Sequence, residues 1–391
     1  HLYALVLIVF GWTLFSIENL PQMWGYFLVM IGAAGAPAID AAALYYLKGY
    51  LPMLVILAVA STPLLKNLYE KRLRADAETI LRASIGAVKP DSAVRRALEG
   101  ARFPGRVFLV AVGKAAWQMA SVARETLPAL AGGVVVTKYG HVKGEIADVA
   151  CYEGGHPVPD ENSLRGTAAA LALTQDLRAD DTVLFLLSGG GSALFEQPLL
   201  PLADLQDITR ALLAAGADIV EINTVRKRLS AVKGGRFAAH CAPAQVFSIV
   251  LSDIVGDPLD MIASGPACPD RSTCAQALAV AEKYRLRLSP RARALLCRET
   301  PKTLENVTTK ITGSVRALCA AAEKECRALG YESVLLTDRL TCEAREAGSF
   351  LASVARTHVS SKRPLAFLAG GETVVHLHGT GKGGRNQELA L

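Results

Sequence analysis

A run of small residues near the middle of the chain has the composition of an anion-binding turn. The apolar segment Thr182–Leu187 ends abruptly there, and a segment able to form a helix follows at once. The turn consists of Ser188, Gly189, Gly190, Gly191 and Ser192. Backbone N–H groups at a strand-to-helix turn point toward an anion, and the helix dipole adds about half a positive charge. Because glycines have no side chain, a phosphate can approach this backbone closely. The alternative is a tight turn without a ligand.

A lysine follows another apolar segment, Val107–Val112, which we expect to form a strand. Gly113 and Lys114 come next and open an expected helix, Ala115–Glu125. A lysine in the first helical turn opposes the dipole and costs a few tenths of a kcal/mol. At the carboxyl end of a strand it can neutralise a phosphate or a developing charge. We therefore interpret Lys114 as functional, with an ordinary exposed lysine as the alternative.

Two carboxylates lie beyond a third expected strand, Val246–Leu251. Asp253 and Asp257 both occupy the loop that follows it. Carboxylates at this edge of a sheet can hold Mg²⁺ through one or two oxygens, as phosphoryl transfer requires. One of them can also accept a proton from a substrate hydroxyl. Use in turns and helix caps is the alternative.

Three further side chains can face an anionic substrate. His156 lies in a loop made rigid by two glycines and two prolines, and can bind substrate or act as acid or base. It can equally be a structural histidine beside Asp160–Ser163, which is typical of a helix cap. Arg226 and Lys233 can contact an anion, or they can form a solvated basic helix face.

A second glycine-rich string precedes Arg385 near the end of the chain. Gly379, Gly381 and Gly384 match the pattern GxGxxG, which alone is weak evidence for a dinucleotide site. A basic glycine loop at the start of a helix suits phosphate in general.

Alternating strands and helices must position these residues. From about residue 73 onward, short apolar strands alternate with helices of 10–15 residues, which is typical of a doubly wound, mostly parallel α/β sheet. Ligands of such sheets lie at the carboxyl ends of strands, where most of these motifs fall. Further strands are expected at Gly133–Thr137, Ser333–Leu336 and Leu365–Ala369. The other expected helices are Leu73–Ala87, Asp91–Leu98, Thr167–Leu177, Leu202–Ala215, Ile222–Leu229, Ala275–Tyr284, Pro290–Arg298, Val315–Leu329 and Cys342–Thr357.

The first 72 residues carry few charges and resemble a helical membrane segment. Three apolar runs, Leu2–Ile17, Trp24–Ile39 and Leu51–Leu65, are each slightly short of the roughly 20 residues that span a bilayer. We expect three spans, or two spans and an interfacial piece, with a buried globular helical pair as the alternative. Basic residues after the last run would place the rest of the chain in the cytoplasm, anchored at the inner or plasma membrane.

Composition narrows the classes of protein. The 391 residues suffice for two or three domains. A net charge of +6 without a Lys/Arg run of the kind that forms a polyanion-binding patch argues against nucleic acid and suits a small anionic substrate. The eight cysteines form no CxxC pair, so we expect reduced thiols and no structural metal. Because the chain begins at His1 and stops at Leu391 within an apparent helix, we expect a fragment at both ends.

Seven ordered strings over residues 73–391 resemble the glycerate 2-kinases whose C-terminal half is called the MOFRL domain. The strings are VGKAA, EGGHPVPDENS, LLSGGGSALFEQP, INTVRKRLSAVKGGRFA, VLSDIVGDPLDMIASGPACPD, GGET and GKGGRNQELAL. The resemblance implies phosphorylation of D-glycerate at its 2-hydroxyl by ATP with Mg²⁺, giving 2-phosphoglycerate.

The same resemblance implies residue roles. It assigns Lys114 and Arg385 to the reacting phosphate, with Asp253 as the catalytic carboxylate and Asp257 as the metal ligand. From the residue patterns described above, we expect D-glycerate to contact His156, Arg226 and Lys233. The nucleotide would contact Gly113, Ser188, Gly189, Gly190, Gly191, Ser192, Gly381 and Gly384.

A different resemblance covers the N-terminal segment. The strings IVFGWTLFSIENLPQMWGYFLVMIG and LPMLVILAVASTPLLKNLYEK resemble the C-terminal membrane part of membrane-bound O-acyltransferases of the alginate O-acetylation branch. The family's catalytic histidine lies upstream, so this segment is expected to be inactive. We expect a membrane fragment over residues 1–72, a kinase α/β domain over 73–310 and a truncated MOFRL-like domain over 311–391. A joined reading frame, with the kinase's own start near Leu73, explains the combination better than a natural fusion.

Two other functions stay open at this point. The first is an oxidoreductase of the hydroxypyruvate reductase type, a name that members of the kinase family have carried. Against it, neither glycine string belongs to a first βα unit with an acidic residue about 20 positions further on. The second is an inactive acyltransferase tail joined to an inactive kinase fragment.

Overall fold

The computed structural model describes residues 11, 19–31, 33, 35, 41–60, 62–252, 254–376 and 383–391. The chain divides into two compact units, His1–Asp76 and Ala77–Leu391.

The described part of the first unit is helical. It contains α2 (Leu20–Met30), α3 (Ala41–Ala60) and the beginning of α4 (Leu64–Val88). None of the described helices is long and apolar enough to span a membrane. The spans expected in the second and third apolar runs are therefore not supported, because α2 already ends at Met30 and the turn at Pro63 separates α3 from α4. The first run lies outside the described residues apart from Gly11.

Six parallel strands form the main sheet of the second unit, in the order β3-β2-β1-β4-β5-β6. The strands are β1 (Val107–Val112), β2 (Gly132–Lys138), β3 (Val149–Gly154), β4 (Thr182–Leu187), β5 (Gln245–Leu251) and β6 (Val307–Thr312). Every residue of β1 and β4 is buried, as expected for central parallel strands covered on both faces. The expected doubly wound α/β sheet is confirmed.

Helices cover both faces of this sheet, and alternate residues of each strand face opposite layers. On one face, Leu109 and Leu184 pack in a core with residues of α5 (Pro90–Leu98) and α6 (Ala116–Thr126). On the other face, Val110 and Phe185 pack in a core with residues of the helices that follow. These are α7 (Glu161–Leu173), α8 (Gly191–Leu194) and α11 (Arg236–His240).

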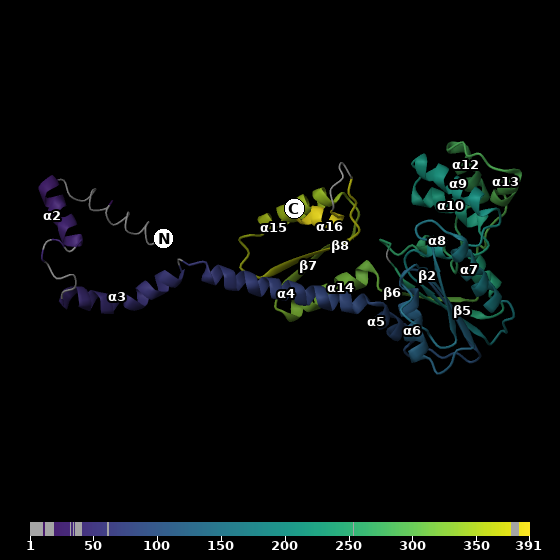
Figure 1. Ribbon diagram of the computed structural model, residues 1–391, viewed down its shortest axis with the longest axis horizontal. Coiled ribbons are helices and arrows are strands. Elements are labelled where there is room, and N and C mark those ends of the chain that lie inside the picture. The colour runs from purple at the N-terminus through teal and green to yellow at the C-terminus, as the bar shows by residue number, and fades with distance from the viewer. Residues whose placement is uncertain are drawn as a thin grey trace. The chain divides into compact units, whose positions relative to one another are not determined.

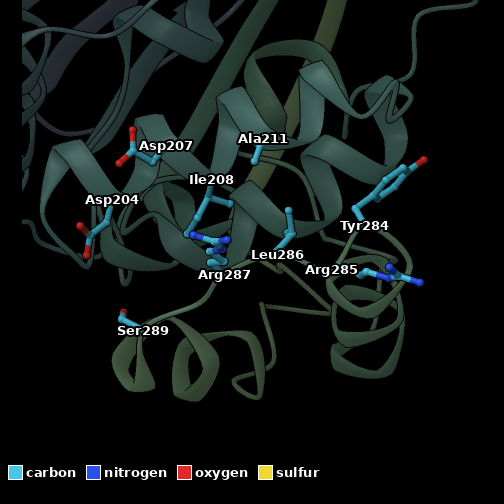
Figure 2. Close-up of a pocket in the computed structure, with 9 residues that line it drawn as sticks. All are labelled: Asp204, Asp207, Ile208, Ala211, Tyr284, Arg285, Leu286, Arg287 and Ser289. Carbon is cyan, nitrogen blue, oxygen red and sulfur yellow. The ribbon is translucent and has the colours of Figure 1, made fainter.

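Four further helices form a core of their own beside the sheet. They are α9 (Leu202–Ala214), α10 (Ile219–Leu229), α12 (Cys274–Lys283) and α13 (Pro290–Leu296). A cavity of about 520 Å³ lies between α9 and the segment Tyr284–Ser289 (Figure 2). None of its lining residues was expected to be functional from the sequence.

A second sheet follows β6 and contains two parallel strands, β7 (Glu332–Leu340) and β8 (Leu365–Gly371) (Figure 1). Its helices are α14 (Val315–Ala328), α15 (Ala344–Thr357) and α16 (Arg385–Ala390). Because β6 ends at Thr312, the boundary expected between residues 310 and 311 falls inside a strand of the first sheet.

Candidate active site

Two turns leave the main sheet side by side at the point where its strand order reverses. The order runs outward in opposite directions from β1 and β4, and open α/β sheets bind their ligands in the crevice at such a point. The register pairs Val112, the last residue of β1, with Leu187, the last residue of β4. The turn that carries Lys114 and the glycine-rich turn therefore start at the same edge.

The turn after β1 is bonded directly to the turn after β4. Lys114 donates its N–H to the carbonyl oxygen of Gly189 at 2.9 Å, and Ala115 donates its N–H to Ser188 Oγ at 3.1 Å. Gly113 has a φ of 116°, and a Cβ added there would lie 2.3 Å from Ser188 Oγ. A side chain at this position would force the two turns apart, so glycine is required.

Lys114 and His156 converge on the second turn. A Cβ added at Gly190 would lie 3.0 Å from Cδ2 of His156 and 3.2 Å from Cε of Lys114. Gly190 has a φ of 88°, which favours glycine for a second reason. The structure thus places together two of the expected side chains and the glycine-rich turn. We call Lys114, His156 and Gly189–Ser192 the edge cluster.

The helix after the glycine-rich turn is only one turn long. α8 contains four residues, and Phe195 after it has φ −115° and ψ 84°, outside the helical region. A macrodipole is the sum of aligned peptide dipoles, so one turn of helix contributes little of it. The expected dipole contribution is therefore wrong, and the backbone N–H groups remain as the feature suited to an anion.

Two buried cations donate hydrogen bonds to carbonyl groups of α8 and of the residue that follows it. Lys233 is completely buried, and its Nζ donates to the carbonyl oxygens of Ser192 and Phe195 at 2.9 and 3.0 Å. Arg226 donates through Nη2 to the same Ser192 oxygen at 3.0 Å. Glu196 Oε2, also fully buried, lies 3.3 Å from Arg226 and 3.5 Å from Lys233. We call Glu196, Arg226 and Lys233 the buried charge cluster.

These positions contradict a solvated basic face for Arg226 and Lys233, whereas the substrate contact expected for Arg226 stays a prediction. A solvated basic face is wrong, since Lys233 is fully buried and the side chain of Arg226 is 11% exposed. A direct contact between Lys233 and substrate is not what the structure shows, because its ammonium group faces the backbone of α8. Burial lowers the pKa of Lys233 to about 8. The geometry favours a structural role for Lys233, in which its hydrogen bonds fix the backbone of the glycine-rich turn and α8.

The loop after β5 reaches the same turn. Ser264 donates from Oγ to Oδ1 of Asn223 at 2.8 Å, and its Oγ lies 3.4 Å from that of Ser192. Ser264 and Asp257 both have positive φ values, 63° and 53°, and such strain in non-glycine residues tends to occur at functional sites. Asp257 is partly buried, whereas Asp253 lies outside the described residues. The described residues contain no group of three or more His, Cys, Asp or Glu that could hold a metal ion.

Comparisons with known proteins identify the family. A family model described as "Domain of unknown function (DUF4147)" matches residues 76–297. A D-glycerate 2-kinase of Thermotoga maritima is 53% identical over 319 residues, which are 80% of this chain and 76% of the relative. A crystal structure of glycerate kinase from Thermotoga maritima superimposes with a TM-score of 0.79 at 51% identity, covering 82% of this chain and 79% of that one. The chain belongs to the glycerate kinase family.

A differently named relative matches the same share of this chain. A putative hydroxypyruvate reductase of Agrobacterium vitis is 38% identical over 329 residues, 80% of this chain and 74% of the relative. None of these matches supports the resemblance of residues 1–72 to membrane acyltransferases.

The contacts of Arg385, in the last of the family strings, are with residues that directly follow β8. Arg385 opens α16, where its Nη2 lies 2.7 Å from Oε1 of Glu372 and its Nη1 donates to the Thr373 oxygen at 3.1 Å. Gly384 precedes this helix, and Gly381 lies outside the described residues. Within the described residues, the structure therefore does not add Arg385 to the edge cluster.

Several residues of the site were missed from the sequence. Glu196 offered a signal, because a lone acid in the apolar stretch LFEQPLL must find a partner when buried. Asn223 and Ser264 lie in two of the family strings but were given no role, since they are 41 positions apart and meet only in the fold. His141 and Thr137, which bond to the turn after β1, lay in a stretch without any recognised motif.

Proposed function

We propose that this chain transfers the γ-phosphoryl group of ATP to the 2-hydroxyl of D-glycerate, giving 2-phosphoglycerate and ADP. The observation that carries the proposal is the edge cluster, where a lysine, a histidine and a glycine-rich backbone converge at the reversal of strand order. Membership of the glycerate kinase family supports the choice of substrates.

Lys114 has the chemistry to balance charge at the transferred phosphoryl group. Phosphoryl transfer leaves little covalent work to the protein, so positioning and electrostatic stabilisation supply most of the rate. The N–H groups of the glycine-rich turn, with Gly113 and Ser188 beside them, would bind nucleotide phosphates. His156 would donate a hydrogen bond to D-glycerate, and Arg385 would add a second positive charge at the reacting phosphate.

The loop after β5 fits a magnesium ion brought in with the nucleotide. Mg²⁺ is usually bound by one or two carboxylates together with substrate phosphates and water, so a site made of three protein ligands is not required. Asp257 supplies a partly exposed carboxylate in this loop. Mg²⁺ neutralises phosphate charge when it is bound. Asp253 would accept the proton of the 2-hydroxyl.

The reductase activity is the second candidate, favoured by the name of one relative and by the strand order. The order β3-β2-β1-β4-β5-β6 is that of dinucleotide-binding folds. Such folds place GxGxxG after β1 and an acidic residue near the end of β2. Here Gly113-Lys114-Ala115 follows β1, and β2 ends in Lys138. These residues favour phosphate over a ribose hydroxyl.

One pair of assays separates the two activities. The full chain is incubated with D-glycerate, ATP and Mg²⁺, and ADP formation is followed while ³¹P NMR identifies which monophosphate accumulates. A parallel incubation contains hydroxypyruvate with NADH or NADPH. We expect ADP and 2-phosphoglycerate in the first and no oxidation of the reduced nucleotide in the second. NADH or NADPH oxidation without glycerate-dependent ADP formation would overturn the kinase.

A further inference from the structure

The turn that carries Lys114 is bonded on its second side by residues of β2 and the loop after it. Gly113 donates its N–H to the Val136 oxygen at 3.0 Å, and its own oxygen accepts from Thr137 Oγ1 at 2.9 Å. The carbonyl oxygen of Lys114 lies 2.8 Å from Nδ1 of His141. Together with the bonds to the glycine-rich turn, these contacts give the N–H and carbonyl groups of both turn residues a partner.

The hydrogen-bond partner of His141 determines which ring nitrogen carries the proton. A backbone carbonyl oxygen only accepts hydrogen bonds, so Nδ1 of His141 carries a proton and donates. In the neutral ring this leaves Nε2 without a proton. The bond therefore defines both the orientation and the tautomer of the imidazole.

The loop that carries His141 is itself held at both ends. Glu153, in β3, accepts the backbone N–H groups of His141 and Val142 at 2.9 and 2.8 Å. These bonds, with that of Val142 foremost, lower the pKa of Glu153 below its ordinary value. At the far end, Trp117 Nε1 donates to the Gly144 oxygen at 2.9 Å. His141 thus contacts the Lys114 turn from a loop whose backbone is fixed by hydrogen bonds to Glu153 and Trp117.

We propose that His141 is a positioning residue for Lys114, acting through the hydrogen bond from Nδ1 to the Lys114 carbonyl. The inference rests on the proposed function. The side chain of Lys114 is exposed, so the place of its ammonium group depends on the backbone from which it starts. A displacement of about 1 Å at a reacting group can cost about 100-fold in rate. A bond that fixes this backbone therefore contributes to turnover without touching substrate.

Three substitutions separate the two ring nitrogens. His141→Asn places an amide nitrogen where Nδ1 stands, His141→Gln places one near Nε2, and His141→Ala removes both. We expect kcat to fall about 10- to 100-fold in the Ala and Gln variants. The Asn variant should stay within about threefold of the parent, and KM for ATP and for D-glycerate should change less than about threefold in all three.

Other outcomes assign His141 differently. Full activity of His141→Gln with loss in His141→Asn would overturn the proposal and place the function on Nε2, as a substrate ligand or a proton carrier. A large rise in KM with unchanged kcat would indicate substrate binding instead of positioning. Parent-like activity in all three variants would remove His141 from the mechanism.

Hydrogen–deuterium exchange gives a readout that does not depend on kinase activity. The amides of Lys114 and Ala115 should exchange faster in His141→Ala and His141→Gln than in the parent, and at the parent rate in His141→Asn. Unchanged exchange in His141→Ala would overturn the positioning role. If the parent shows no glycerate-dependent ADP formation, the proposed function fails, while the exchange result still decides whether His141 holds the turn. Thermal unfolding of each variant identifies any that fail to fold.

Discussion

The two turns at the reversal of strand order face the same site but are held by different interactions. The turn after β1 is fixed by neutral hydrogen bonds from Thr137, His141 and the backbone of its neighbours. The turn after β4 is fixed from behind by the buried charge cluster, in which two cations share one carboxylate. The first arrangement depends on several weak contacts, and the second on charges that must stay balanced.

The difference has a physical consequence for substitutions. Removing one neutral hydrogen bond typically changes stability by about 1 kcal/mol. Removing one partner of a buried ion pair typically costs about 3–5 kcal/mol, because the remaining charge is left without compensation in a medium of low dielectric. A single substitution should therefore cost much more free energy of unfolding at the turn after β4 than at the turn after β1.

Replacing Lys114 should have the largest effect on function and almost none on the fold. Lys114→Ala removes the ammonium group proposed to face the phosphate, and loss of one such group costs about 100- to 1,000-fold in kcat. Its side chain is exposed, so the midpoint of urea unfolding should stay close to that of the parent. Steady-state kinetics and urea titrations measure the two quantities.

The control for this variant is Lys324→Ala, which removes an exposed lysine of α14. It should keep full activity. Unchanged turnover in Lys114→Ala would exclude Lys114 from the mechanism, and a large loss of stability would show that the turn depends on its side chain after all.

The sequence predicts the central part of this site because local pattern determines it. β1 and β4 are continuous apolar runs buried on both faces, and their bounds were predicted without error. The edge strands β3 and β6 were missed, because their partly exposed positions mix polar with apolar residues. The start of α7 was predicted at Thr167 instead of Glu161, although the capping box of Asp160 and Ser163 was visible.

The supports of the site could not be predicted, because they are long-range contacts. The burial of Lys233 depends on Glu196, 37 positions earlier, and on the carbonyl groups of a helix whose short length no local pattern shows. Lys233 is followed by Gly234 and Gly235, and this composition alone predicts an exposed lysine. Its burial follows only once α8, Glu196 and Arg226 are folded around it.

Replacing Glu196 should cause the largest loss of stability in the site. Glu196→Gln keeps the size of the side chain but leaves Arg226 and Lys233 together in the interior without a counter-charge. We expect the free energy of unfolding to fall by about 3 kcal/mol. Urea denaturation followed by circular dichroism measures it.

The matched control is Glu305→Gln, an exposed glutamate before β6, which should change stability by less than about 0.5 kcal/mol. A loss in Glu196→Gln as small as that of the control would mean that the buried charges are not balanced by this carboxylate.

Lys233 gives the same cluster a dependence on pH. Burial lowers the pKa of Lys233 to about 8, from 10.5 for an unfolded lysine. The charge of Glu196 raises this pKa, and the charge of Arg226 lowers it further. Between these values the unfolded chain holds more protons, so the contribution of Lys233 to the free energy of unfolding rises with pH. The full rise is about 3 kcal/mol from below pH 8 to above pH 10.5.

The variant Lys233→Met isolates this effect, because all other titrations cancel when its unfolding free energy is subtracted from that of the parent. At pH 7 the free energy of unfolding of the variant should be about 1–2 kcal/mol below that of the parent. The hydrogen bonds to Ser192 and Phe195 are lost, but the cost of burying one cation is removed, which offsets part of that loss. The difference should then grow between pH 8 and 10. A difference that stays constant would show that Lys233 keeps an ordinary pKa.

Thr137→Val should have the smallest effect and tests the neutral half of the comparison. Thr137 is fully buried in β2, and its Oγ1 donates to the Gly113 oxygen at 2.9 Å. Valine keeps the β-branched shape that suits a strand, so the variant removes one hydrogen bond and little else. We expect the free energy of unfolding in urea to fall by about 1 kcal/mol, since the Gly113 oxygen loses its side-chain donor but keeps the N–H of Ala116 at 3.1 Å. Thr308→Val, at an exposed position of β6, is the control and should be nearly neutral. A loss above about 3 kcal/mol would show that the turn after β1 depends on a single bond and fails as abruptly as the turn after β4.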